Sequence, residues 1–84
     1  MKAYNATDFG VMFRRERRAL KKTQGQLAKE LGCGRQTIVD LEAGRNVGIQ
    51  TVFAALAALG KAIEIMDARY EFDRMPDFMS DADD

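Results

Sequence analysis

The segment TQGQLAKELGCGRQTIVDLEAG, residues 23–44, contains a helix start and two glycine stops, so it has room only for short helices. Thr23 and Gln26 have the T-x-x-Q spacing of a capping box, in which each side chain bonds the other residue's backbone N–H. Gly32 is typical of the left-handed residue that ends a helix. A second helix then fits residues 35–43. The segment therefore predicts two short helices joined by a tight glycine turn.

The flanking segments predict one more helix on each side. The earlier helix is expected to begin at Thr7 or Asp8, both suitable N-caps, and the later one covers residues 49–59. Apolar spacing assigns buried faces to both helices. These faces comprise Phe9, Met12, Phe13 and Leu20 in the earlier helix, and Ile49, Val52, Phe53, Leu56 and Leu59 in the later one.

The segment KAIEIMD, residues 61–67, is open to two interpretations. Ile63 and Ile65 alternate with their neighbours as in a β-strand, and Gly60 before them favours that interpretation. A continuing helix is the alternative by spacing. The strand is the expected element.

Size and composition limit what the chain does. It has 84 residues, no histidine and a single cysteine. Such a chain forms one domain with a marginal core, for which oligomerisation is a common remedy. Cys33 is expected to be a small apolar turn residue, and no disulfide, metal site or nucleophile–base pair is apparent. No segment approaches the roughly 20 apolar residues of a membrane span. We therefore expect a cytoplasmic, nucleoid-associated protein that is not an enzyme and has no cofactor.

The net charge of zero conceals a strong asymmetry. Residues 1–61 hold eleven Lys and Arg against five Asp and Glu, whereas residues 62–84 hold two against eight. A basic body suggests a nucleic-acid partner. We expect residues 1–69 to form the binding and dimerisation domain and residues 70–84 to form an acidic, partly disordered tail.

Polar residues begin the helix that follows the glycine turn. Arg35, Gln36 and Thr37 stand at its N-terminal end, while Ile38 and Leu41 point to a core. In a helix-turn-helix, the N-terminal residues of the second helix reach base edges in the DNA major groove. Arg pairs with guanine and Gln with adenine. The alternative to DNA binding is a small helical core whose third helix has a solvated polar end.

The segment TQGQLAKELGCGRQTIVDLEAGRN resembles the helix-turn-helix of Xre/Cro-like repressors, and the likeness covers residues 9–60. It implies a mostly α, lambda-repressor-like domain of four to five helices. It also implies a buried ion pair between Arg17 and Glu42, and a phosphate contact by Gln24 that braces the recognition helix. The DNA-binding residues that the resemblance implies are Gln24, Arg35, Gln36, Thr37, Asp40, Arg45 and Asn46.

Four positions depart from that pattern. Gly34 replaces the usual serine cap, and Lys21 and Lys22 replace a common glycine and an apolar residue. Asp40 stands where many members have Arg, Lys or Gln. Its carboxylate repels phosphate but is able to accept a hydrogen bond from cytosine N4.

The segment IQTVFAALAALGKAIEIMDAR resembles HipB-type antitoxins, in which the last helix runs into a short strand. The resemblance implies that this strand pairs with its copy in a homodimer, through Ile63, Ile65 and Met66. It further implies repression of the protein's own operon through palindromic operator DNA. A HipA-like Ser/Thr kinase toxin is the implied partner.

Two other functions stay open. The chain fits a stand-alone or phage-type repressor without a toxin. It also fits a protein-interaction module with vestigial DNA binding, whose acidic tail is the active part; Gln24, Arg35 and Gln36 speak against that function.

Overall fold

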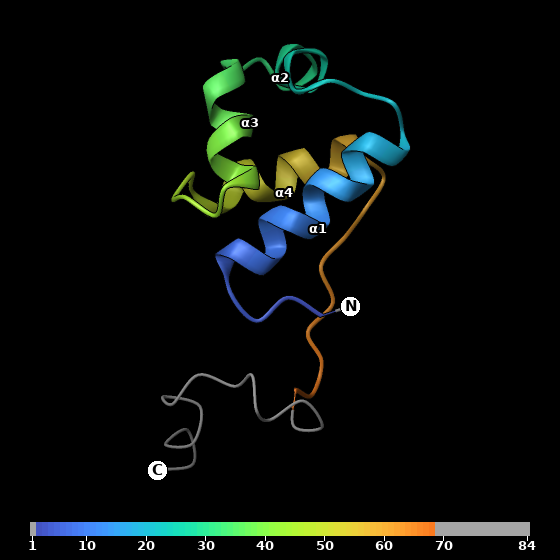
Figure 1. Cartoon of the computed structure of the whole chain (residues 1–84), viewed down its shortest axis with the longest axis vertical. Coiled ribbons are helices and arrows are strands. Elements are labelled where there is room, and N and C mark those ends of the chain that lie inside the picture. The colour runs from blue at the N-terminus through green and yellow to red at the C-terminus, as the bar shows by residue number, and fades with distance from the viewer. Residues whose placement is uncertain (1, 69–84) are drawn as a thin grey trace.

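Four short helices form the fold of residues 2–68, the part of the chain that the computed structural model describes (Figure 1). The helices are α1 (Ala6–Ala19), α2 (Gln24–Leu31), α3 (Arg35–Glu42) and α4 (Ile49–Ala58). α2 and α3 form the helix-turn-helix, and α1 and α4 support it from below in this view. The helical architecture predicted from the sequence is confirmed.

The start of α1 differs from the prediction. Its N-cap is Asn5, whose side chain accepts a hydrogen bond of 2.7 Å from the backbone N–H of Asp8. Asp8 instead lies in the first turn, where its carboxylate accepts a 3.1 Å bond from the backbone N–H of Tyr4. The prediction of Thr7 or Asp8 as the cap was therefore wrong by two or three residues. α2 has the predicted capping box and ends at Gly32 in the left-handed conformation.

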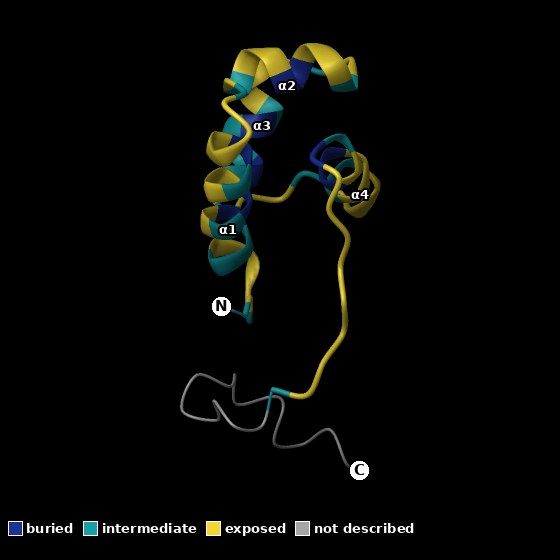
Figure 2. Cartoon of the chain, turned by 90° about the vertical axis from the view of Figure 1, so that its right-hand side faces the viewer, coloured by how far each residue is buried: buried dark blue, intermediate teal, exposed yellow. Residues whose placement is uncertain are grey.

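The core lies where the apolar faces of all four helices meet (Figure 2). Its buried side chains are Phe13, Leu27, Ala28, Ile38, Leu41, Ala55, Leu56 and Leu59. Cys33 packs against the edge of this cluster, in agreement with its predicted role as a small apolar residue. None of the helices within residues 2–68 is long and apolar enough to cross a membrane.

Three apolar residues assigned to buried faces are exposed. Leu20 follows the end of α1 and is 48% exposed, while Ile49 and Phe53 of α4 are 68% and 52% exposed. The face of α4 that meets the core carries Ala55, Leu56 and Leu59. Ile49 begins the helix, ahead of that face, and periodicity alone did not distinguish Phe53 from Val52 beside it.

α1 and α3 approach closely at Gly10. This residue is buried, and a Cβ atom built there would lie 2.8 Å from the carbonyl oxygen of Leu41 and closer still to that of Glu42. Only glycine allows the α1 backbone to rest on the last turn of α3. The contact fixes the orientation of α3 relative to α1.

The segment after α4 leaves the helical body (Figure 1). Residues 61–68 belong to neither a helix nor a strand, so the helical alternative for 61–67 is wrong. Strand pairing with a second copy of the chain stays a prediction. The predicted acidic tail, 70–84, lies outside the described residues.

A buried ion pair joins α1 to the end of α3. Arg17 Nε donates to Glu42 Oε2 at 2.6 Å, and Arg17 Nη2 donates to Glu42 Oε1 at 3.1 Å. The two side chains are only 9% and 4% exposed. Arg17 Nη1 also donates to the carbonyl oxygen of Lys22 at 2.6 Å. The pair thus holds α1, the α1–α2 turn and α3 in one arrangement.

Removing one member of this pair should destabilise the fold strongly. Arg17→Ala leaves the Glu42 carboxylate buried without its cation, a change that typically costs about 3–5 kcal/mol of unfolding free energy. The exposed pair between Lys61 and Glu16, at 3.2 Å, provides the control, because Lys61→Ala should cost less than about 1 kcal/mol. Urea unfolding at equal protein concentration measures both. Equal losses in the two variants would contradict a structural role for Arg17.

Candidate nucleic-acid interface

The N-terminal end of α3 presents polar side chains on a rigid support. Arg35 and Gln36 are exposed and Thr37 is half-buried, while Ile38 and Leu41 anchor the other face of the helix in the core. Gly34 caps α3 without a side-chain hydrogen bond. No capping side chain therefore stands in front of the first turn of α3, and the polar side chains of this turn are accessible.

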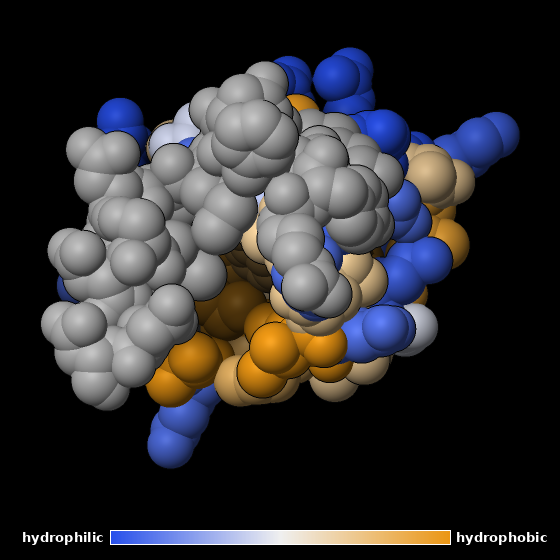
Figure 3. Space-filling model, turned by 90° about the horizontal axis from the view of Figure 1, so that it is seen from below, coloured by the Kyte–Doolittle hydropathy of each residue, from blue (hydrophilic) through white to orange (hydrophobic). Residues whose placement is uncertain are grey.

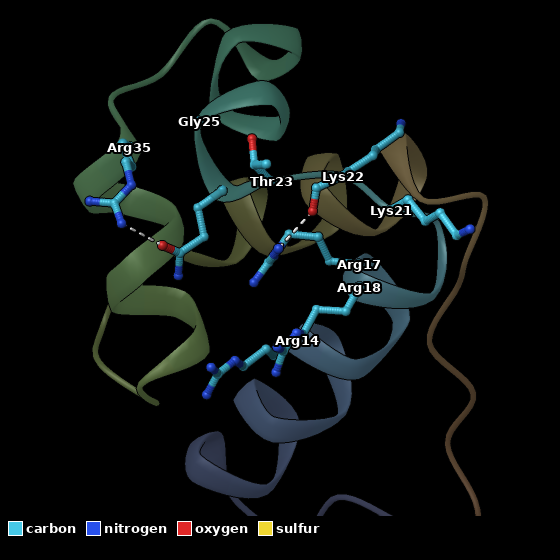
Figure 4. A pocket seen from close by; sticks show the side chains of 9 residues that line it. Arg14, Arg17, Arg18, Lys21, Lys22, Thr23, Gly25 and Arg35 are labelled. Carbon is cyan, nitrogen blue, oxygen red and sulfur yellow. Dashed lines mark hydrogen bonds between the residues drawn. The ribbon is translucent and has the colours of Figure 1, made fainter.

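Gln24 connects this end of α3 to the buried ion pair. Its Nε2 donates to Glu42 Oε1 at 3.1 Å. Its Oε1 accepts from Arg35 Nη2 at 3.0 Å, the bond drawn as a dashed line at Arg35 in Figure 4. One glutamine amide thus places the Arg35 guanidinium relative to Glu42 and Arg17. This arrangement fixes an exposed arginine through a partly buried network.

Asp40 is the second centre of the interface. Its Oδ1 accepts from Gln36 Nε2 at 2.9 Å and from Arg45 Nη1 at 3.0 Å. The hydrogen bond from Gln36, followed by that from Arg45, holds the pKa of Asp40 below its ordinary value. The carboxylate is therefore ionised at neutral pH, and its charge is offset by Arg45. The pairing with Arg45 offsets the repulsion between the Asp40 carboxylate and a DNA phosphate that the sequence led us to expect.

Thr37 and Asn46 are the remaining predicted DNA-binding residues, and neither joins the Gln24–Arg35 bond or the bonds at Asp40. Thr37 lies in the first turn of α3, and its backbone N–H donates to the carbonyl oxygen of Gly34 at 3.1 Å. Asn46 follows Arg45 in the loop, where its Oδ1 accepts from the backbone N–H of Gly48 at 3.3 Å. The structure thus gives Asn46 a role in shaping the loop.

A basic groove between α1 and the start of α2 was missed by the sequence analysis. It encloses about 640 Å³, and residues 23–25 form one wall. The cationic residues that line it are Arg14, Arg17, Arg18, Lys21, Lys22 and Arg35. The signal was available, because Arg14 and Arg18 stand four residues apart and so share one face of α1.

The residues predicted to form the dimer contact lie at the opposite end of the molecule. Ile63 and Met66 are about half exposed, and Ile65 is 95% exposed. Ile63 and Met66 also line an apolar groove of about 580 Å³, with Phe9, Met12 and Val52 among its other walls. Figure 3 shows apolar side chains around a hollow on this face. Within residues 2–68 no cluster of His, Cys, Asp or Glu could hold a metal ion.

Comparisons with known proteins agree with this geometry. The model of the helix-turn-helix family matches residues 13–66. The chain is similar to the solved structure of the "HipB-O4 20mer complex", at 29% identity and a TM-score of 0.74, over 81% of this chain and 97% of that one. It is also similar to a chain of the "HipA-HipB-O2-O3 complex", at 28% identity and a TM-score of 0.74, with the same coverage of both. No curated protein sequence matches it significantly.

The pairing at Asp40 predicts a measurable titration. Its pKa should lie below the ordinary value of 3.8, and Gln36→Ala or Arg45→Gln should raise it toward that value. Because the folded-state pKa is lowered, the stabilisation is complete above the ordinary value and is lost as pH falls through the lowered value. An NMR titration of the Asp40 carboxyl carbon tests this. A pKa at or above 3.8 would show that the two hydrogen bonds do not persist in solution.

Proposed function

The chain belongs to the helix-turn-helix family and is a DNA-binding regulator of the HipB type, and from this premise we propose that it represses its own operon as an antitoxin. The observation that carries the proposal is the exposed N-terminal turn of α3. Arg35 and Gln36 stand there on a buried frame, and their chemistry suits base edges. The experiment that tests it is a selection of operator sequences.

We assign the reading of bases to the first residues of α3. Arg35 is suited to bidentate pairing with guanine O6 and N7, and Gln36 to adenine N6 and N7. Thr37 is placed for a thymine methyl group or a phosphate, and Asp40 for cytosine N4. Gln24, Arg45 and Asn46 flank this turn and are assigned to the sugar–phosphate backbone, which positions α3 without reading sequence.

Binding of DNA exchanges bonds that already exist in the free protein. Arg35 is bonded to Gln24 and Gln36 to Asp40 before DNA arrives. A matching base replaces those partners, whereas beside a mismatched base Arg35 and Gln36 keep their internal partners and the base edge gains no hydrogen bond from the protein. A base edge left unpaired in the interface costs free energy. Discrimination therefore arises from the bonds that only a matching base completes.

A dimer is the second part of the proposal. Within the described part of the chain, residues 62–66 make no backbone–backbone hydrogen bond, and their isoleucines are exposed. Antiparallel pairing with a second copy would satisfy the backbone groups and cover the side chains. A two-fold dimer would bind a palindrome with half-sites about 34 Å apart or a multiple of that spacing. Ile63, Ile65 and Met66 are the residues assigned to this contact.

A HipA-like kinase toxin is the third part. Its support is the likeness to a chain of the "HipA-HipB-O2-O3 complex" and the sequence of residues 70–84, where six acidic residues are interleaved with aromatic residues and methionines. Acidic segments of this kind suit binding to a basic or apolar groove of a partner. A stand-alone repressor is the alternative. A kinase-like reading frame beside the gene would favour the antitoxin, and its absence would favour the alternative.

Variants of the two reading residues should change base preference. Arg35→Ala and Gln36→Ala should each lose about 1–3 kcal/mol of discrimination, at one position in each half-site. Gln24→Ala should instead weaken binding to all sequences by a similar factor, because a phosphate contact carries no base information. Selection from randomised duplexes, followed by sequencing, measures the preferences. Unchanged preferences in both α3 variants would refute the assignment of the reading helix.

Proline substitutions test the dimer. Neighbouring residues of a strand point their N–H groups in opposite directions, so Glu64→Pro or Ile65→Pro should remove a paired donor and shift the protein to monomer. Glu64→Thr is the matched control, since it keeps the N–H at a position whose side chain is not assigned to the contact. Light scattering at micromolar concentration gives the mass. Full dimer in both proline variants would place the contact elsewhere, and exposed Phe53 of α4 would be the next candidate.

A further inference from the structure

We propose that Val39 of α3 is a further specificity-determining residue, and that its methyl groups contact the C5-methyl group of a thymine in the major groove. That methyl group is the apolar mark by which thymine is distinguished there. The contacts assigned above to the polar residues of α3 do not involve Val39. The inference rests on the DNA-binding function proposed above and adds one base position to it.

The first argument is that Val39 does not serve the core. α3 contains three branched apolar residues, of which Ile38 and Leu41 are buried. Val39 is half-buried, and within residues 2–68 it is not among the partly buried residues that pack against the core cluster. A β-branched residue is also a poorer helix former than alanine. The fold therefore gains little from a valine at this position.

The second argument is the position of Val39 on α3. It follows Arg35 by four residues and Gln36 by three, so it lies on the same face of the helix, one turn further along. Side chains of an α-helix lean toward its N-terminus, and the Val39 side chain therefore leans toward the turn assigned to base edges. Thr37, the other residue placed for a thymine methyl group, stands two residues earlier and lies on a different face.

The third argument is how the polar neighbours of Val39 are held. Arg35 Nη2 donates to Gln24 Oε1 of α2 at 3.0 Å, and Gln36 Nε2 donates to Asp40 Oδ1 at 2.9 Å. The helical repeat places Val39 between Arg35 and Gln36 when α3 is viewed along its axis. An apolar surface thus lies between two polar groups that are bonded to other residues. A thymine methyl group suits this surface, because it needs no hydrogen-bond partner.

The geometry also predicts where the thymine lies in the operator. An α-helix rises about 1.5 Å per residue, so Val39 lies about 6 Å from Arg35 along α3. Successive base pairs are about 3.4 Å apart. The thymine should therefore lie about one or two base pairs from the position whose preference changes in Arg35→Ala.

Replacement of single thymines by deoxyuridine tests the contact, because it removes the C5-methyl group and keeps every hydrogen-bonding group of the base. The probe is the operator selected by the unmodified protein, with each thymine replaced in turn. Fluorescence anisotropy gives the affinities. Loss of one buried methyl contact should weaken binding about fourfold, and replacement in both half-sites of a dimer about sixteenfold.

Val39→Ala completes the comparison. This variant should bind the thymine operator more weakly, and deoxyuridine at the contacted position should then have no further effect. Alanine favours helix formation, so the melting temperature should not fall much. Val11→Ala is the matched control, since Val11 is a 50% exposed valine on α1, outside the helix assigned to bases. It should keep the full effect of deoxyuridine.

Thr37→Ser separates the two residues that carry a methyl group on this part of α3. A deoxyuridine effect that persists in Val39→Ala and disappears in Thr37→Ser would overturn the inference and assign the methyl contact to Thr37. An operator in which Val39→Ala abolishes the effect at no thymine would also overturn it, while selective binding by the unmodified protein would leave the proposed function standing. Failure of the unmodified protein to bind DNA would overturn both.

Discussion

The carboxylate of Glu42 is the point on which the arrangement of three helices depends. It accepts two hydrogen bonds from Arg17 of α1 and one from Gln24 of α2, and it sits at the end of α3. Gln24 extends the same network to Arg35. A buried charge of this kind is tolerated only when its partners are all present. The position of the exposed Arg35 side chain, which we propose binds DNA, is therefore tied to the packing of the core.

The turn between α1 and α2 shows how the fold accommodates two lysines where Xre/Cro-like proteins commonly have a glycine and an apolar residue. Lys21 has a φ of +59°, a left-handed conformation that is unfavourable for a side chain with a Cβ. Lys22 compensates from the next position, since its Nζ bonds Glu30 at 2.9 Å and the carbonyl of Ala58 at 3.3 Å. It thereby joins the turn to α2 and to the end of α4.

Local signals predicted the parts of the fold that local chemistry determines. The capping box of Thr23 and Gln26 and the left-handed Gly32 depend on neighbours within a few residues, and the sequence showed both. Phe53 was assigned to the core wrongly, because a periodic pattern identifies residues that share a face but not the neighbour that covers it. The bonds between Gln24 and Arg35 and between Asp40 and Arg45 depend on how helices and loop meet, which no spacing rule describes.

The shared oxygen of Asp40 has a consequence for how this protein would find its site among unrelated DNA. Gln36 and Arg45 both donate to that one atom in the free protein, so each side chain already has an acceptor before DNA binds. DNA that lacks the matching base must compete with the Asp40 carboxylate for the hydrogen bonds of Gln36 and Arg45. If α3 reads bases as proposed, this internal competition weakens binding to unrelated sequence, whose phosphate contacts alone still allow sliding and hopping along DNA. Under the proposed function, an acidic residue on the helix assigned to DNA would thus shorten residence on the wrong sequence.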